Sequence, residues 1–115
     1  MPSNASFDPT KTRTNPDRLT EWCASPVGED ILETPGVGPA NKAILEAQGI
    51  TTTFQLLALF LSLKGKEVGS VELCERFYQQ LATWGIVAGR GEITQAIAVK
   101  LNNSFPGLYN ASLYT

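Results

Sequence analysis

The 115-residue sequence contains no histidine, only two cysteines and little net charge. Without histidine, catalytic triads and general-base schemes that depend on an imidazole are excluded. Cys23 and Cys74 are too few for a disulfide framework and have no CxxC spacing for zinc, so we interpret them as buried, reduced thiols. We expect a protein that is not an enzyme and that has neither a cofactor nor a metal site.

The sequence also lacks a long apolar run. Its longest apolar-rich segment, residues 54–63, is far shorter than the roughly 20 residues that a membrane-spanning helix needs. The N-terminus has no positively charged leader followed by an apolar stretch. We therefore expect an intracellular protein without membrane insertion, located in the nucleus, the cytoplasm or both.

The composition indicates one modest domain between two less regular ends. Hydrophobic residues make up 43% of the chain, enough for a single core. Residues 1–14 are rich in Ser, Thr, Asn and Pro with Phe7 as their one large apolar side chain, which predicts a flexible arm. The domain is expected over residues 15–105. Residues 106–115 begin with a Pro-Gly break and are either frayed or folded back through Leu108 and Tyr109.

Apolar spacing, caps and breaks predict an all-α fold of five or six helices, with no alternating strand pattern. Asn15 and Pro16 are typical of a helix start, and Gly49 is typical of a helix end. The segment after Thr53 is apolar on nearly every side, which indicates the central core helix. We expect helices over residues 16–24, 27–33, 39–48, 54–63, 70–84 and 93–104.

Residues 31–45, ILETPGVGPANKAIL, are the most informative segment for function. Two glycines around Val37 favour a tight hairpin with free backbone amides, and Pro39 suits the first turn of the next helix. Exposed amides at the positive end of a helix can hold a DNA phosphate without a basic side chain. The hairpin therefore predicts a phosphate site, and the alternative is a plain turn without a ligand.

Nucleotide loops fit this segment poorly. The Walker pattern GxxxxGK[ST] is absent. A dinucleotide loop needs a third glycine where Asn41 stands, and it follows a strand rather than the helix expected here. DNA is the better candidate ligand for the hairpin.

The formal net charge of −2 argues against nucleic acid, but the charges are unevenly placed. Residues 21–63 carry a net −4, whereas the segments before and after each carry a net +1. Arg90, in the second glycine-rich turn at residues 85–91, and Arg18, near the start of the first helix, are candidate phosphate contacts. The alternative for each is a solvated surface arginine.

These residues resemble the barrier-to-autointegration factor family between positions 18 and 105. Residues 21–29, EWCASPVGE, are similar to the family's aromatic, small-residue and Pro-hydrophobic-Gly-Glu passage before its hairpin. Residues 36–38, Gly-Val-Gly, match its Gly-Ile-Gly. Residues 45–50 resemble its Leu-Glu-x-x-Gly-Phe, and residues 54–64 resemble its core helix.

The resemblance implies a helix-hairpin-helix domain of the SAM/BAF-like type. It also implies a chromatin protein that binds and bridges double-stranded DNA of any sequence as a homodimer. In the family, a groove across the dimer receives LEM-domain proteins. The implied DNA contacts are Arg18, Gly36, Val37, Gly38, Ala40, Asn41, Gly89 and Arg90. We also expect Lys42, on the hairpin helix, to face phosphate.

The sequence departs from the family at the hairpin helix. Ala43 and Ile44 stand where the family has two lysines, and Lys42 lies one position earlier. A different interpretation follows from this change and from the acidic balance: a protein-interaction module of the same fold that does not bind DNA.

Overall fold

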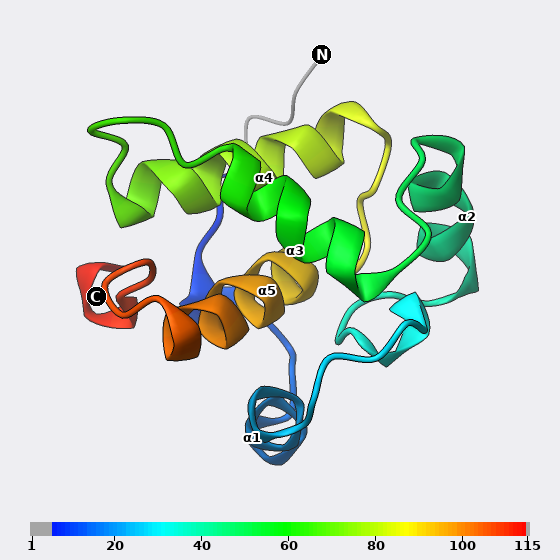
Figure 1. Ribbon diagram of the computed structural model, residues 1–115, viewed down its shortest axis with the longest axis horizontal. Helices are drawn as coiled ribbons and strands as arrows, with labels where there is room; N and C mark the ends of the chain where they lie inside the picture. Colours follow the sequence, from blue (N-terminus) through cyan, green and yellow to red (C-terminus); the bar gives the residue numbers. More distant parts are fainter. Residues whose placement is uncertain (1–5, 115) are drawn as a thin grey trace.

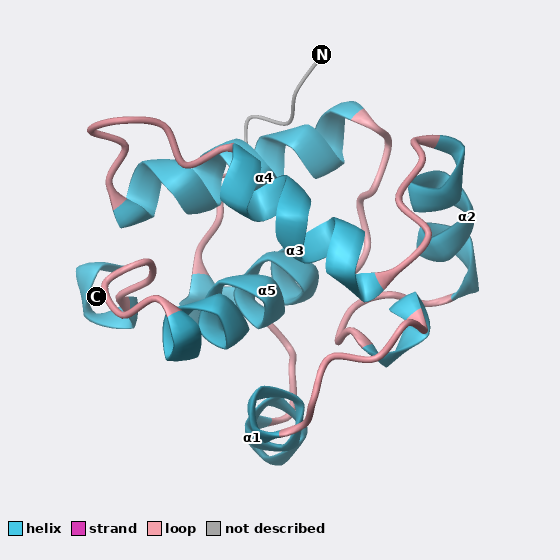
Figure 2. Cartoon of the chain, viewed as in Figure 1, coloured by secondary structure: helices cyan, strands magenta, loops and turns pink. Residues whose placement is uncertain are grey.

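The computed structural model describes residues 6–114 of the chain. Over that range it contains five α-helices, three 3₁₀ turns and no strand, which confirms the all-α class (Figures 1 and 2). The elements are η1 (Pro9–Lys11), α1 (Pro16–Ala24), η2 (Ile31–Glu33), α2 (Pro39–Ala47), α3 (Thr53–Ser62), α4 (Ser70–Thr83), α5 (Arg90–Ser104) and η3 (Ala111–Tyr114). None of these helices has both the length and the apolar character that crossing a membrane requires.

Local chemistry explains where several helices begin and end. The Asn15 side chain accepts hydrogen bonds from the amides of residues 17 and 18 and so caps α1. Thr52 and Gln55 form a reciprocal capping box at the start of α3. Gly49, with a φ of +82°, follows the end of α2, in the left-handed conformation that the sequence predicts there. The boundaries of α1, α2 and α3 therefore follow from signals in the sequence.

The last helix, α5, is the centre of the packing. It contacts α1, α3 and α4, and Figure 1 shows it between α4 and α1, with α3 crossing nearby. Ile93, Ala96 and Ile97 of α5 are fully buried. On its partners, the rings of Phe60 in α3 and Phe77 in α4 lie 5.2 Å apart between centroids. Helices from both halves of the chain thus share one core.

A buried lysine joins α1 to α5. Lys100 is 7% exposed, and its ammonium group donates to the main-chain carbonyls of Trp22 and Ser25 at the end of α1. The same ammonium lies 4.3 Å from the centre of the Trp22 ring, whose indole N–H donates to the carbonyl of Ala96 at 2.8 Å. Carbonyls at a helix C-terminus carry partial negative charge and attract a cation. Lys100 therefore fixes α1, and with it Arg18, against the core.

The flexible arm predicted for residues 1–14 is wrong for its described part, residues 6–14; residues 1–5 lie outside the described residues. Phe7 is 3% exposed and packs against the rings of Tyr78 and Tyr114. Its amide donates to Glu75 Oε1 at 2.9 Å. The burial of Phe7 and the long-range hydrogen bonds of this segment offset the entropy lost on ordering it. The composition of the segment predicts neither of these contributions.

The C-terminal residues fold back onto the domain. Leu108 and Tyr109 are 8% and 9% exposed, so the folded-back alternative is the correct one for the described residues. Asn102 holds this turn because its side-chain oxygen accepts hydrogen bonds from the amides of Gly107 and Tyr109, at 3.0 and 3.1 Å. Leu108 and Tyr109 thereby become part of the core.

Two further expectations need correction. The short helix predicted over residues 27–33 is only the 3₁₀ turn η2, which Asp30 caps. The preceding loop is held instead by the Glu33 carboxylate, which accepts a hydrogen bond from the amide of Gly28 at 2.8 Å. Both cysteines are free, but only Cys74 is buried, whereas Cys23 is partly exposed.

Candidate nucleic-acid interface

The hairpin at residues 34–39 has one side that faces the core. Its turn is closed by a hydrogen bond from the amide of Val37 to the carbonyl of Thr34, at 3.0 Å. Gly36 adopts a φ of +93°, which favours glycine. Val37 is 7% exposed, so its side chain belongs to the core. The predicted DNA contact at Val37 can therefore involve only its main chain.

The other side of the hairpin, where α2 begins, is open. Gly38 is the N-cap of α2, and a Cβ atom built on it would meet no other atom within 4 Å. The first bond of the helix runs from the amide of Lys42 to the carbonyl of Gly38. The amides of Ala40 and Asn41 precede that bond and have no acceptor in the part of the chain that the structure describes. These amides can receive an anion.

The second glycine-rich turn packs directly on the hairpin. A Cβ atom on Gly36 would lie 2.6 Å from the carbonyl oxygen of Gly89, and a Cβ atom on Gly89 would collide with the carbonyl oxygen of Gly36. Gly89 is the N-cap of α5 and also has a positive φ, +84°. The structure therefore brings together two glycine-rich turns that are about 50 residues apart in the sequence.

Asn41 holds the two turns together. Its side-chain amide donates to the carbonyl of Gly36 at 3.0 Å and to the carbonyl of Ala88 at 2.8 Å. This clamp satisfies two carbonyls from different turns, so the side chain has a structural role where the resemblance implies a DNA contact. Its main-chain amide remains at the open start of α2.

Arg90 does not lie where the prediction placed it. It is 8% exposed, and its guanidinium carbon lies 4.3 Å from the centre of the Tyr78 ring. Nη2 donates to the Tyr78 hydroxyl at 3.1 Å, and Nη1 donates to the carbonyl of Ile86 at 3.2 Å. The guanidinium group thus turns toward α4 and stabilises the start of α5 instead of standing at the rim of the turn.

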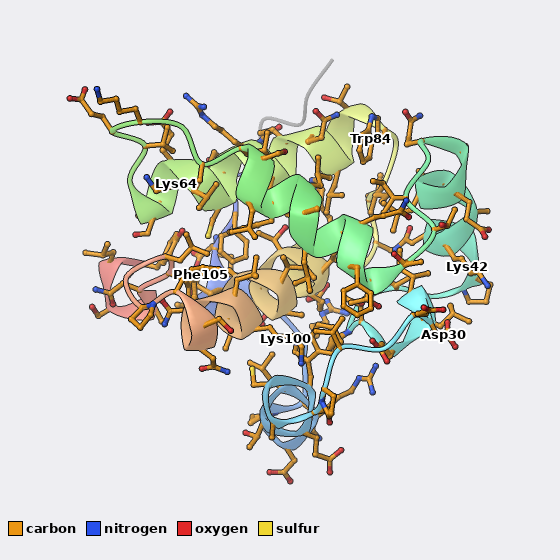
Figure 3. The ribbon with its side chains drawn as sticks, in the orientation of Figure 1. Asp30, Lys42, Lys64, Trp84, Lys100 and Phe105 are labelled. Carbon is orange, nitrogen blue, oxygen red and sulfur yellow. The ribbon has the colours of Figure 1, made fainter. Side chains whose placement is uncertain are left out.

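Two other predicted basic residues lie near the hairpin. Arg18 is exposed, and its Nη2 lies 3.4 Å from the carbonyl oxygen of Glu33, at the end of η2 just before the hairpin. Lys42 is half-buried in α2, at the edge of the molecule that carries this helix (Figure 3). Lys42 directly follows Asn41 in α2, and Arg18 contacts the residue three positions before Gly36.

The acidic side chains beside the hairpin act as internal acceptors. Glu33 Oε1 accepts from the Gly28 amide at 2.8 Å and from the Thr53 hydroxyl at 3.1 Å. Asp30 accepts from the amide of Leu32 at 2.9 Å. Part of the negative charge of residues 21–63 is therefore committed to loop and cap hydrogen bonds. Within residues 6–114, no three His, Cys, Asp or Glu residues are grouped so that they could hold a metal ion.

Arg13 is not among the predicted DNA contacts, because it belongs to the segment whose composition predicts a flexible arm. The Arg13 amide donates to Glu92 Oε2, in the first turn of α5, at 2.8 Å. No local pattern indicates this contact, since its two partners are far apart in the sequence. Arg13 is exposed and lies beside the helix that Gly89 caps.

No known protein family matches the chain, and comparisons with curated proteins and with solved structures find no similar protein. Any function therefore has to be argued from the residues and from the geometry of the paired turns.

Proposed function

We propose that the chain binds the sugar-phosphate backbone of double-stranded DNA at the open side of the two packed turns. This interface consists of the main chain at Gly38, Ala40 and Asn41, with Arg18 and Lys42 at its edge. The observation that carries the proposal is the start of α2, where free amides lie behind a glycine with open space in front of it. Such amides, at the positive end of a helix dipole, suit a phosphate oxygen.

The chemistry of this interface favours binding without regard to base sequence. Gly38, Pro39 and Ala40 have no side-chain group that could form hydrogen bonds with base edges, and base edges carry the sequence information of a duplex. Amides and arginines that contact phosphates position a protein on DNA but do not select a sequence. A chain with a net negative charge can use such a site, because the free amides bind phosphate without a basic side chain.

An apolar face on α3 supports the homodimer that we propose with this activity. Phe54 is 52% exposed, and Leu57, Ala58 and Leu61, on the same side of the helix, are exposed or only partly buried. The opposite face of α3 is fully buried in the core. In a two-fold dimer each subunit contributes one DNA site, so the pair can bridge two duplexes. Such bridging suits a role in chromatin or nuclear organisation, as the family resemblance implies.

The same α3 face also favours a second candidate, a protein-interaction module that does not bind DNA. Exposed apolar residues grouped on one helix are typical of protein contacts. The two candidates differ in one measurable property, which is the affinity for duplex DNA.

The test is a fluorescence anisotropy titration of two labelled duplexes of unrelated sequence at low salt. We expect equal affinity for both. Because low salt strengthens phosphate contacts, the dissociation constants should fall in the lower part of, or below, the range of about 1–100 µM that is typical of non-specific binding at physiological salt. Absence of binding at tens of micromolar protein would contradict DNA binding and leave the interaction module.

The dimer is tested separately with Phe54→Glu, by sedimentation and by a pull-down of one duplex with another. The charge should separate the subunits and abolish bridging, whereas each subunit keeps its single-duplex affinity. A Phe54→Glu protein that still sediments as a dimer would exclude α3 as the dimer surface.

A further inference from the structure

The N-terminal segment holds an arginine beside the paired turns. The Thr12 hydroxyl donates to Gln95 Oε1 at 2.6 Å, and the Arg13 amide donates to Glu92 Oε2 at 2.8 Å. A Cβ atom on Gly91 would lie 3.5 Å from Cγ2 of Thr12. Three residues in the first half of α5 thus hold Thr12 and the main-chain amide of Arg13. We propose that Arg13 is a further phosphate-binding residue of the DNA interface, an inference that rests on the proposed function.

Arg13 and Arg18 each contact a segment that adjoins the packed turns. Glu92, its backbone partner, lies in the first turn of α5, whose N-cap Gly89 packs against Gly36 of the hairpin. Along the chain, Arg13 is followed by Arg18, whose guanidinium lies at the Glu33 carbonyl before the hairpin. The main chain of Arg13 is therefore attached on the α5 side of the packed turns, and the guanidinium of Arg18 lies on their η2 side.

The spacing of the two arginines fits one duplex backbone. Arg18 follows Arg13 by five positions along the chain, so their Cα atoms can be at most about 18 Å apart. One strand of B-DNA carries a phosphate for every 3.4 Å or so of helix axis. A short stretch of one duplex is therefore long enough for both arginines to contact phosphates.

The charge of Arg13 is available to a ligand. Arg13 is exposed. Within residues 6–114 the salt bridge is formed by Arg76 and Glu72 of α4 and does not involve Arg13. Lys11, by contrast, interacts with Asp8 and contributes to lowering the pKa of that carboxyl, after the larger effect of the Thr10 hydrogen bonds. Because the backbone of Arg13 is already fixed, binding through its side chain requires less additional ordering.

The negative charge of Glu92 should weaken phosphate binding at Arg13, so removing that charge should have the opposite effect to removing Arg13. Its carboxylate accepts the Arg13 amide, so a negative charge stands at the same position. Glu92→Gln keeps a side-chain oxygen that can accept the amide and removes the charge. The substitution should therefore strengthen DNA binding if phosphate lies near Arg13.

The experiment compares the wild type with Arg13→Gln, Glu92→Gln and a control, Lys64→Gln, in anisotropy titrations at several salt concentrations. Lys64 is exposed and lies at the edge of the molecule opposite Lys42 (Figure 3), so its substitution removes the same charge elsewhere. We expect Arg13→Gln to weaken binding about threefold to tenfold on unrelated duplexes and to reduce the salt slope by roughly 0.9. Glu92→Gln should bind severalfold more tightly, and Lys64→Gln should bind like the wild type.

The outcomes separate this inference from the proposed function. If the wild type binds DNA and Arg13→Gln binds with the same affinity and salt slope, Arg13 is not a contact and the interface at α2 remains. Equal losses in Arg13→Gln and Lys64→Gln would reduce the effect to overall charge and overturn the inference. No gain in Glu92→Gln would show that no phosphate lies near this position, which would also overturn it. A wild-type protein that does not bind duplexes would overturn both proposals. Circular dichroism spectra are compared for all variants so that a change in folding is detected.

Discussion

The hairpin uses glycine in two different ways on its two sides. On the closed side, Gly36 and Gly89 allow two backbones to touch, and a Cβ atom on Gly36 would lie 2.6 Å from the neighbouring carbonyl oxygen. On the open side, a Cβ atom on Gly38 would meet nothing within 4 Å. The same residue type therefore serves packing at one position and leaves room for a ligand at the other. Substitutions on the two sides should affect different measurements.

The largest expected effect is on stability, at the closed side. Gly36→Ala adds a Cβ against Gly89 and places alanine at a φ of +93°. Overpacking costs about 1–3 kcal/mol and the left-handed conformation roughly 1–2 kcal/mol, so we expect a loss of about 3 kcal/mol in the free energy of unfolding. Urea denaturation measures it. Gly49→Ala is the matched control because Gly49 has a φ of +82° and open space around it. Equal losses in the two variants would show that the contact between the turns contributes nothing.

On the open side, Gly38→Glu should reduce DNA affinity at least tenfold, which is about 1.4 kcal/mol, without unfolding the protein. The reason is that a carboxylate and its side chain would occupy the space that we assign to a phosphate. Anisotropy titration measures the loss. Gly69→Glu is the control, since Gly69 is the N-cap of α4 and is equally open. If both substitutions weaken binding alike, the effect is one of net charge and the start of α2 is not the site.

Asn41→Ala tests the clamp between the two sides. Removal of the side chain leaves the carbonyls of Gly36 and Ala88 without this donor, and we expect a loss of about 1–2 kcal/mol of stability. DNA affinity should change less than in Gly38→Glu because the main-chain amide is kept. A tenfold loss of affinity at unchanged stability would instead indicate that the Asn41 side chain contacts DNA, as the family resemblance implies.

The smallest effects separate the buried arginine from the exposed one. Arg18→Gln should weaken DNA binding about threefold and reduce the salt slope by about 0.9, with stability within about 0.5 kcal/mol of the wild type. Arg90→Gln should lower stability, because it loses the Tyr78 contact, and leave the salt slope unchanged. The reverse pattern would mean that Arg90 turns outward to bind phosphate and that our placement of the interface is incomplete.

The sequence predicts the features that depend on local signals. Asn15, Gly49 and the apolar residues after Thr53 indicate helix limits and the core helix because caps and periodicity act within a few residues. The open start of α2 is likewise visible in the pattern Gly38-Pro39. Both glycine-rich turns could be predicted from the sequence. Their contact through Gly36 and Gly89 could not, because it depends on how α5 packs and no local sequence pattern indicates that packing.

The missed features all depend on partners that are distant in the chain. Arg90 is buried because Tyr78 of α4 receives its guanidinium group. Phe7 is buried because Tyr78 and Tyr114 surround it, and Lys100 is buried because α1 ends beside it. Arginine and lysine are expected at the surface by default, and Phe7 stands in a segment whose composition predicts disorder. Only the tertiary structure could therefore reveal that these three side chains are buried.

The most direct test of where DNA binds is an amide chemical-shift titration of the ¹⁵N-labelled protein with a short duplex at low salt. We predict that the amides of Gly38, Ala40 and Asn41, at the start of α2, shift progressively as duplex is added. The amides of Gly69 and Ser70, at the start of α4, should remain unchanged, because that helix start is equally open but lies away from the paired turns. Shifts at the start of α4, or anywhere else, without shifts at Gly38 would contradict a binding site on the open side of the hairpin.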